Sequence, residues 1–203
     1  MDAQRPCAIK AAGPSCRPKS AASERCSPGT CWAGHSPKPL RDDEGMSTQE
    51  TETLRTQLAT AMSGRESHID FDSAMKDFPA EARGAKPAGA PHSAWELVEH
   101  MRIAQHDILE FSRNSQHKSP KWPDEYWPKT AAPPDAKAWD AAVKSFGQDA
   151  REFSKLVEDV QQDLFKPFAY GDGQTLLREA LLVATHNSYH LGQLIFLKKM
   201  LAQ

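Results

Sequence analysis

Residues 135–164 read DAKAWDAAVKSFGQDAREFSKLVEDVQQDL, the stretch with the clearest periodicity in this chain of 203 residues. Its apolar side chains recur at alternating spacings of four and three residues, which is the pattern of one buried helix face. The members of this stripe are Trp139, Val143, Phe146, Ala150, Phe153, Val157, Val160 and Leu164. The pattern predicts an amphipathic helix from about residue 135 to residue 164.

Three other segments have the same amphipathic character, and a short helical turn is expected between the first two. The long helices are predicted over about 47–62, over about 93–113, and from 174 or 175 to 201, with the short turn at about 70–78. Ser93 is a good N-cap, and Glu96 three residues later completes a capping-box pattern. No segment alternates with a period of two residues over a useful length, which argues against strands. Four amphipathic helices favour an all-α four-helix bundle.

The link between residues 114 and 134 is longer than a turn between bundle helices requires. It contains the segment Trp122-Pro-Asp-Glu-Tyr-Trp-Pro128, whose aromatic side chains we expect to fold back over one end of the bundle. Trp122, Tyr126 and Trp127 are therefore candidates for the lining of a substrate pocket. The alternative is a hydrophobic cap without a ligand.

Residues 1–45 differ in composition from the remainder of the chain. They contain six prolines, four glycines and five serines, and almost no aliphatic side chains. Such a segment cannot bury enough apolar surface to offset its ordering entropy. We therefore expect a disordered extension over 1–45 and a helical domain over 46–203, with Met46 as the natural start.

All four cysteines lie in this extension, so the domain from Met46 onward contains neither a catalytic thiol nor a disulfide. Cys26, Cys31 and His35 could in principle hold zinc. Their spacing matches no compact Cys-x-x-Cys motif, so an extension without a metal site is the favoured interpretation.

Charge and hydropathy exclude two classes of partner. Met46–Gln203 carries 18 Lys or Arg against 22 Asp or Glu, a net charge of −4, and it has no basic stripe for nucleic acid. No run of 18 or more apolar residues exists, so no transmembrane helix and no membrane partner are expected. These features favour a soluble, cytoplasmic protein.

The segment His186-Asn-Ser-Tyr-His190 places two histidines four residues apart in the apolar stretch near the C-terminus. On a helix they share one face, and Val183, Leu194 and Leu197 follow the same stripe. Both imidazoles should therefore point into the core, where unpartnered polar groups are costly. A bound metal ion resolves that cost, and so would backbone or carboxylate partners. No Glu follows His186, so the segment is not the His-Glu-x-x-His motif of metalloproteases.

His100 is the best candidate for a third ligand because it lies at the edge of the apolar stripe of the helix predicted over 93–113. Asp107 and Glu96 lie near that edge, and either could orient an imidazole through its second nitrogen. The alternative is that both carboxylates are solvated, which we favour for Glu96. His68 could serve as a cap-like structural residue or form the rim of a site.

Three segments together resemble the DinB-like (DinB/YfiT-like) superfamily of metalloenzymes. They are Pro91-His-Ser-Ala-Trp-Glu-Leu-Val-Glu-His100, the Trp122–Pro128 segment, and Gly173 to Gln193, which contains both His186 and His190. The resemblance covers about Met46 to Ala202 and implies a four-helix bundle. It also implies a metal triad of His100, His186 and His190, which would leave open positions for water or substrate.

The resemblance further implies a function. Characterised members include bacillithiol-dependent S-transferases and a mycothiol-dependent maleylpyruvate isomerase. By analogy, one divalent ion, zinc or nickel, would activate a low-molecular-weight thiol cosubstrate toward a small electrophilic substrate. Family members are often homodimers, so a homodimer is expected here by analogy.

Two other functions remain open from the sequence. The protein could be a metal-binding stress or resistance protein that sequesters a ligand without turnover. It could also contain no metal at all, with the histidines serving as polar groups of the core.

Overall fold

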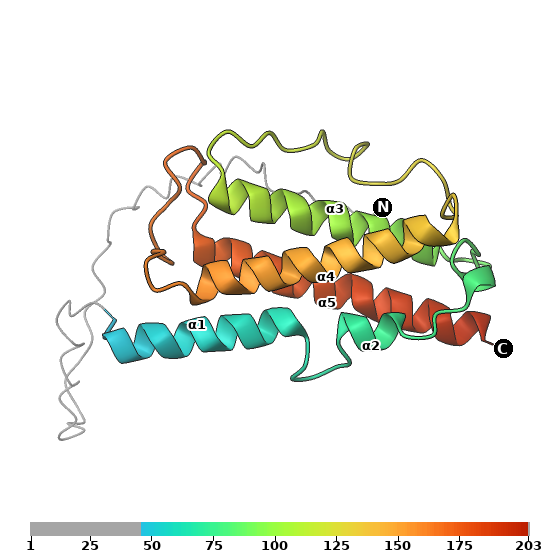
Figure 1. The fold of residues 1–203 in the computed structure, drawn as a ribbon, viewed down its shortest axis with the longest axis horizontal. Helices are drawn as coiled ribbons and strands as arrows, with labels where there is room; N and C mark the ends of the chain where they lie inside the picture. Colours follow the sequence, from blue (N-terminus) through green and yellow to red (C-terminus); the bar gives the residue numbers. More distant parts are fainter. Residues whose placement is uncertain (1–45, 203) are drawn as a thin grey trace, which may run out of the picture.

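The computed structural model describes residues 46–202, and the expectations for the extension and for Cys26, Cys31 and His35 lie outside these residues. The described part is all-helical (Figure 1). Its elements are α1 (Thr48–Ser63), α2 (Phe71–Met75), the 3-10 turn η1 (Ala80–Ala82), α3 (Ala94–Arg113), α4 (Ala136–Glu158) and α5 (Leu176–Leu201). The predicted four-helix bundle is therefore confirmed. No helix within residues 46–202 combines the length and the apolar character that crossing a membrane would require.

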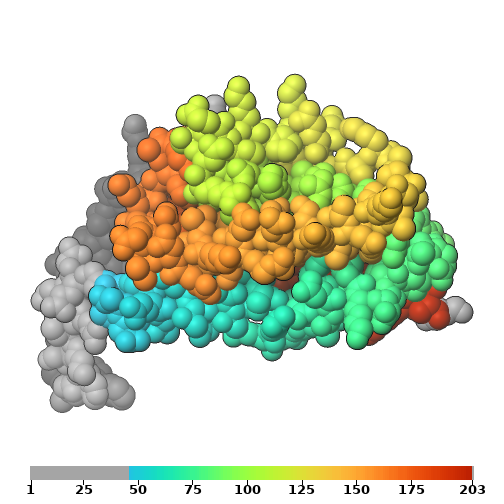
Figure 2. Space-filling view, in the orientation of Figure 1, coloured from blue at the N-terminus to red at the C-terminus, as the bar shows by residue number. Residues whose placement is uncertain are grey.

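The four long helices form a bundle in which α3 and α1 each pack against α4 and α5. Helices α1 and α5 run in one direction and α3 and α4 in the other (Figure 1). Because α3 and α4 are parallel, the chain must return along the whole bundle between them. The segment 114–135 makes this return, and Figure 2 shows it along the upper edge of the molecule.

Side-chain caps explain where the helices begin. Ser47 and Ser93 each accept a hydrogen bond from the backbone N–H of a glutamate three residues later, and that glutamate bonds back to the serine backbone. Asp135 and Thr175 cap α4 and α5 in the simpler way, each through its own side chain. These caps supply acceptors for N–H groups that have no partner within the helix.

Helix α4 ends at Glu158, so the predicted extension to Leu164 was wrong. Val160, expected in the apolar stripe, is 63% exposed. The chain leaves the helix because Arg55 of α1 donates to the carbonyl oxygens of Val157, at 2.6 Å, and of Gln162. The Asp159 side chain also accepts the backbone N–H of residue 161, which favours a turn over a further helical turn.

Two apolar clusters fill the interior on either side of a polar level. Gln105, at that level, donates to the carbonyl of Phe146 at 2.8 Å and accepts from the side chain of Asn187 at 2.7 Å. One cluster contains Met101 and Leu194 and the other contains Ile108 and Val183, so α3 and α5 contribute to both, as α4 does through Phe146 and Phe153. The polar level thereby fixes how α3, α4 and α5 are aligned along their axes.

Replacing Arg55 with Met should lower the free energy of unfolding by about 1–3 kcal/mol, because the carbonyl oxygens of Val157 in the last turn of α4 and of Gln162 beyond it lose their donor. Urea denaturation followed by circular dichroism measures this change. Arg113→Met is the matched control, since Arg113 makes only solvent-accessible ion pairs with Glu110 and Glu152. We expect less than about 1 kcal/mol there. Equal losses in both variants would contradict the capping role of Arg55.

Candidate metal centre

Three histidines meet where α3 packs against α5. His100 comes from α3, and His186 and His190 come from successive turns of α5. One nitrogen from each imidazole lies within 4.8 Å of the others, so the cluster could hold a metal ion. The Nε2 atoms of His100 and His186 are 3.1 Å apart. The Nε2 of His190 is buried and has no hydrogen-bond partner among residues 46–202.

The other ring nitrogens determine how two of these imidazoles are oriented. His100 Nδ1 lies 3.0 Å from the carbonyl oxygen of Tyr126, and His190 Nδ1 lies 2.8 Å from Oε1 of Gln193. Both oxygens can only accept, so each Nδ1 carries the proton and donates it. In a neutral imidazole the Nε2 then has a free lone pair, which is the state in which histidine binds a metal.

Burial keeps the cluster neutral at physiological pH. The pKa of His186 is lowered from 6.5 to about 3, mainly by desolvation and in addition by its neighbours His190 and His100. The pKa of His100 is lowered from 6.5 to about 4, mainly by desolvation, although the hydrogen bond to Tyr126 partly opposes this change. The pKa of His190 is lowered for the same main reason. No proton therefore competes for these nitrogens near pH 7.

Aromatic rings cover the cluster on the side of segment 114–135, the long crossover that joins α3 to α4. Trp127 is stacked on His100 with centroids 4.0 Å apart and planes 2° from parallel, and His92 is stacked on Trp127 at 4.1 Å. Trp122 lies 6.5 Å from His100 and is 39% exposed, so it stands at the edge of this wall. The predicted aromatic segment therefore lies alongside α3 at the histidines and does not cover one end of the bundle.

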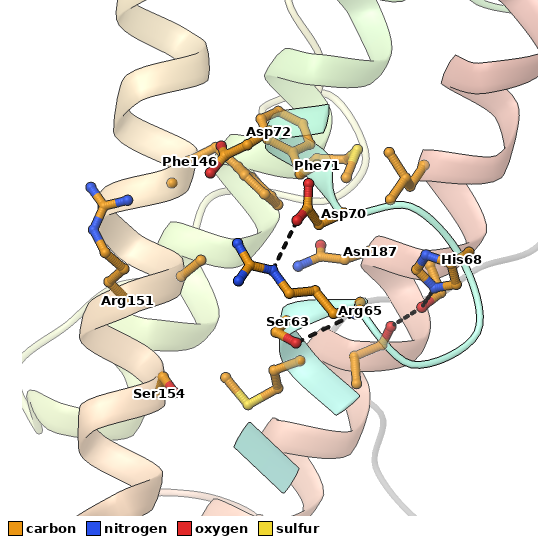
Figure 3. A pocket seen from close by; sticks show the side chains of 18 of the residues that line it. Ser63, Arg65, His68, Asp70, Phe71, Asp72, Phe146, Arg151, Ser154 and Asn187 are labelled. Atoms are coloured by element: carbon orange, nitrogen blue, oxygen red, sulfur yellow. Dashed lines mark hydrogen bonds and ion pairs between the residues drawn. The ribbon is translucent and has the colours of Figure 1, made fainter. Parts of the chain in front are cut away.

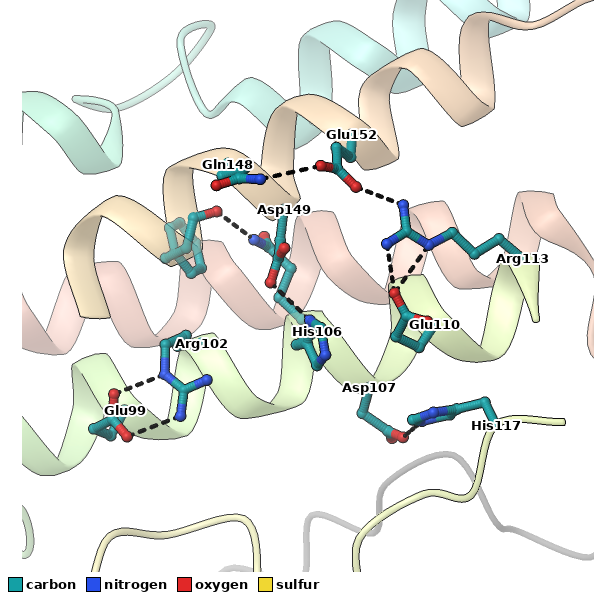
Figure 4. Close-up of polar contacts among 12 residues, drawn as sticks. Glu99, Arg102, His106, Asp107, Glu110, Arg113, His117, Gln148, Asp149 and Glu152 are labelled. Atoms are coloured by element: carbon teal, nitrogen blue, oxygen red, sulfur yellow. Dashed lines mark hydrogen bonds and ion pairs between the residues drawn. The ribbon is translucent and has the colours of Figure 1, made fainter. Parts of the chain in front are cut away.

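Tyr126 is buried and connects the crossover to α3 at two points. Its backbone carbonyl accepts from His100, and its hydroxyl donates to Oδ2 of Asp107 at 2.5 Å. The other carboxylate oxygen of Asp107 lies 2.8 Å from Nε2 of His117 (Figure 4). The residue that contacts His100 Nδ1 is thus Tyr126, and Asp107 acts on the imidazole only through Tyr126.

The remaining histidines and acids have other partners. Glu96 belongs to the Ser93 capping box and also pairs with Lys86, and its side chain is only 17% exposed, so it is a capping residue rather than a solvated carboxylate. His106 pairs with Asp149 on α4 at 3.1 Å. His68 lies 3.0 Å from the hydroxyl of Ser188 and takes no part in the triad.

Sequence reasoning missed three contributors, namely Gln193, His92 and His117. Only Gln193 carried a usable signal, because it lies three residues after His190 on the same helix.

Comparison with known families agrees with this geometry. A family model described as the DinB superfamily matches residues 65–194. The chain belongs to the DinB superfamily. The matched region of this DinB protein includes all three histidines of the cluster and the crossover that covers them. No individually curated protein and no solved structure matches the chain.

The lowered pKa values predict that acid destabilises the metal-free protein. Histidines of the unfolded chain take up protons below their ordinary pKa of 6.5, whereas His100 and His186 of the folded chain do so only near about 4 and about 3. The unfolded state therefore binds more protons, and stability falls as the pH decreases from 6.5. Urea denaturation in the presence of a chelator measures this slope. A His186→Gln variant should have a flatter profile, and an unchanged slope would contradict the assignment.

Tyr126 contacts both His100 and Asp107, so we expect its hydroxyl to strengthen metal binding by holding the Tyr126 backbone against His100. Tyr126→Phe keeps the carbonyl that accepts from His100 but removes the donor to Asp107, so zinc affinity should fall about tenfold. Competition with a chromophoric chelator measures that affinity. Tyr170→Phe is the control, because the Tyr170 hydroxyl donates to the carbonyl of Phe111 outside the cluster. Equal zinc affinities of the Tyr126→Phe and wild-type proteins would contradict this role of the Tyr126 hydroxyl.

Proposed function

We propose that this DinB protein is a metal-dependent enzyme that uses a low-molecular-weight thiol to transfer or isomerise a small electrophile. His100, His186 and His190 would hold one divalent ion. The observation that carries the proposal is the Nε2 of His190, a buried nitrogen beside two further imidazoles that has no hydrogen-bond partner in the part of the chain that the structure describes. A purely structural core would leave this nitrogen unsatisfied at a cost, whereas a metal ligand would not.

The donor atoms fit a divalent ion. Zinc binds histidine nitrogen at about 2.0–2.1 Å in tetrahedral geometry, which places two ligand nitrogens about 3.3 Å apart. The observed separation of 3.1 Å between His100 Nε2 and His186 Nε2 is close to that value. Three neutral imidazoles suit zinc and nickel alike, so the donor set is compatible with either ion.

The chemistry of the proposal follows from what the chain supplies and lacks. A divalent ion held by three protein ligands would lower the pKa of a thiol bound at an open position and so provide a nucleophile near neutral pH. The chain has no cysteine from Met46 onward, so the thiol has to come from a cosubstrate. Tyr126 and Gln193 orient the His100 and His190 rings, and Trp127 keeps water from one face of His100.

Metal analysis tests the site itself. Protein purified without a histidine tag should contain roughly one divalent ion per chain by mass spectrometry, as expected for a three-histidine site. His186→Ala and His190→Ala should lose the ion and keep their helical circular dichroism. His106→Ala is the control, because His106 pairs with Asp149 outside the cluster and should leave the metal content unchanged. Metal-free wild-type protein that takes up neither zinc nor nickel would overturn the proposal.

Turnover tests the reaction. Metal-loaded protein should catalyse displacement of chloride from a haloarene such as 1-chloro-2,4-dinitrobenzene by a small thiol, with formation of a thioether and release of chloride and a proton. His190→Ala should lose that activity. Metal binding without turnover, across several thiols and electrophiles, would instead support a protein that binds metal and sequesters a ligand.

A further inference from the structure

A pocket of about 200 Å³ lies between α1, α2, α4 and α5 (Figure 3), and none of the three histidines of the cluster lines it. Asn187, Ser188 and Leu191 of α5 line it. Asn187 and Leu191 come one residue after His186 and His190, and Ser188 comes two residues after His186. Each residue turns the helix by about 100°, so these side chains point away from the two histidines. The pocket and the histidine cluster therefore use different faces of α5. No step of the proposed reaction uses the pocket.

The inner wall of the pocket is apolar and the rim is charged. Phe71, Met101, Phe146 and Leu191 form the inner wall, and all four are buried. Four charged residues stand at the rim, two of each sign: Arg65, Arg151, Asp70 and Asp72. The volume is below the about 300–1,000 Å³ of pockets for drug-sized ligands. A ligand would therefore be small and would combine an apolar part with charge.

Two of the four rim charges are already paired. Arg65 Nε lies 2.8 Å from Oδ2 of Asp70, and the same carboxylate caps α2 by accepting from the backbone of Ser73. His68 fixes this rim segment to α5 through Ser188, at 3.0 Å. This wall of the pocket is thus held in place by contacts within the protein.

The other two rim charges have no partner within residues 46–202. Arg151 and Asp72 are exposed and make neither an ion pair nor a side-chain hydrogen bond there, although they flank the same glycine. A Cβ atom added to Gly147 would lie 3.4 Å from Arg151 Nη1 and 3.8 Å from Asp72 Oδ1. Glycine is unfavourable within a helix compared with alanine, and here it leaves space between a guanidinium and a carboxylate.

Asn187 of the pocket donates its amide to Gln105, and its Oδ1 accepts no hydrogen bond from residues 46–202. This oxygen is buried, so it is not open to a ligand in the pocket. The rim thus presents one cationic donor and one carboxylate acceptor, both exposed and not paired within the described residues. A ligand with a carboxylate and an ammonium group matches this set.

We propose that this pocket binds a small zwitterion with an apolar side group, the chemistry of a hydrophobic α-amino acid. The ligand carboxylate pairs with Arg151, the ammonium group pairs with Asp72, and the apolar group lies against Met101 and Phe146. The site is independent of the metal proposed above, because it contains none of the three histidines.

Titration of the full-length ¹⁵N-labelled protein with L-leucine tests the site by chemical-shift changes. We expect saturable changes centred on Gly147, Arg151 and Ser188. The analogues 4-methylpentanoate and 3-methylbutylamine each lack one charge and should bind at least about tenfold more weakly. Arg151→Gln and Asp72→Asn should weaken leucine binding by a similar factor. Lys155→Gln, which removes a solvent-exposed charge of α4 outside the pocket, should not change it.

Three results would overturn the inference: no shift changes up to the solubility limit of leucine, equal binding of leucine and its singly charged analogues, or equal binding by Arg151→Gln and wild-type protein. His190→Ala separates this site from the metal centre. Leucine should still bind to that variant even if the protein proves to contain no metal. Loss of binding in a folded His190→Ala protein would place the ligand at the histidines and would also contradict the inference.

Discussion

The parallel arrangement of α3 and α4 is the constraint on which the histidine cluster depends. Two adjacent helices that run in the same direction cannot be joined by a short turn, so residues 114–135 must return along the bundle. This return brings Tyr126 and Trp127 alongside His100. An antiparallel pair with a short turn would have left the outer side of His100 open to solvent. The long connection is therefore part of the site.

The histidine cluster shows how buried polar groups can be prepared for a ligand. Each of two imidazoles uses Nδ1 for a hydrogen bond within the protein, which leaves Nε2 unprotonated beside its neighbours. Burial lowers the pKa of all three rings, so the lone pairs remain available at neutral pH. The same burial makes the His190 Nε2 costly without a partner. Hydrogen bonds at Nδ1 thus set the orientation of the rings, whereas burial accounts for both their protonation state and the cost of the unsatisfied nitrogen.

Helix α5 carries two different chemical environments on two faces. One face contributes His186 and His190, and the other lines the pocket with Asn187 and Ser188. Gln105 bonds to Asn187 at the level between them and holds α3, α4 and α5 in alignment. The helix can serve both because neighbouring residues point about 100° apart.

The sequence by itself determined the helices, the bundle and the two histidines of α5, because helical periodicity and capping are local and leave a repeating pattern. It also gave His100 as a candidate, since that residue borders an apolar stripe. The end of α4 at Glu158 could be seen only in the tertiary structure, because Arg55 from another helix binds the carbonyl of Val157 in the last turn of α4. The contacts of Tyr126 could also be seen only in the tertiary structure, because its partners His100 and Asp107 lie 26 and 19 residues away in the sequence. Such contacts depend on how helices pack and on where a long connection runs, and no local pattern encodes either.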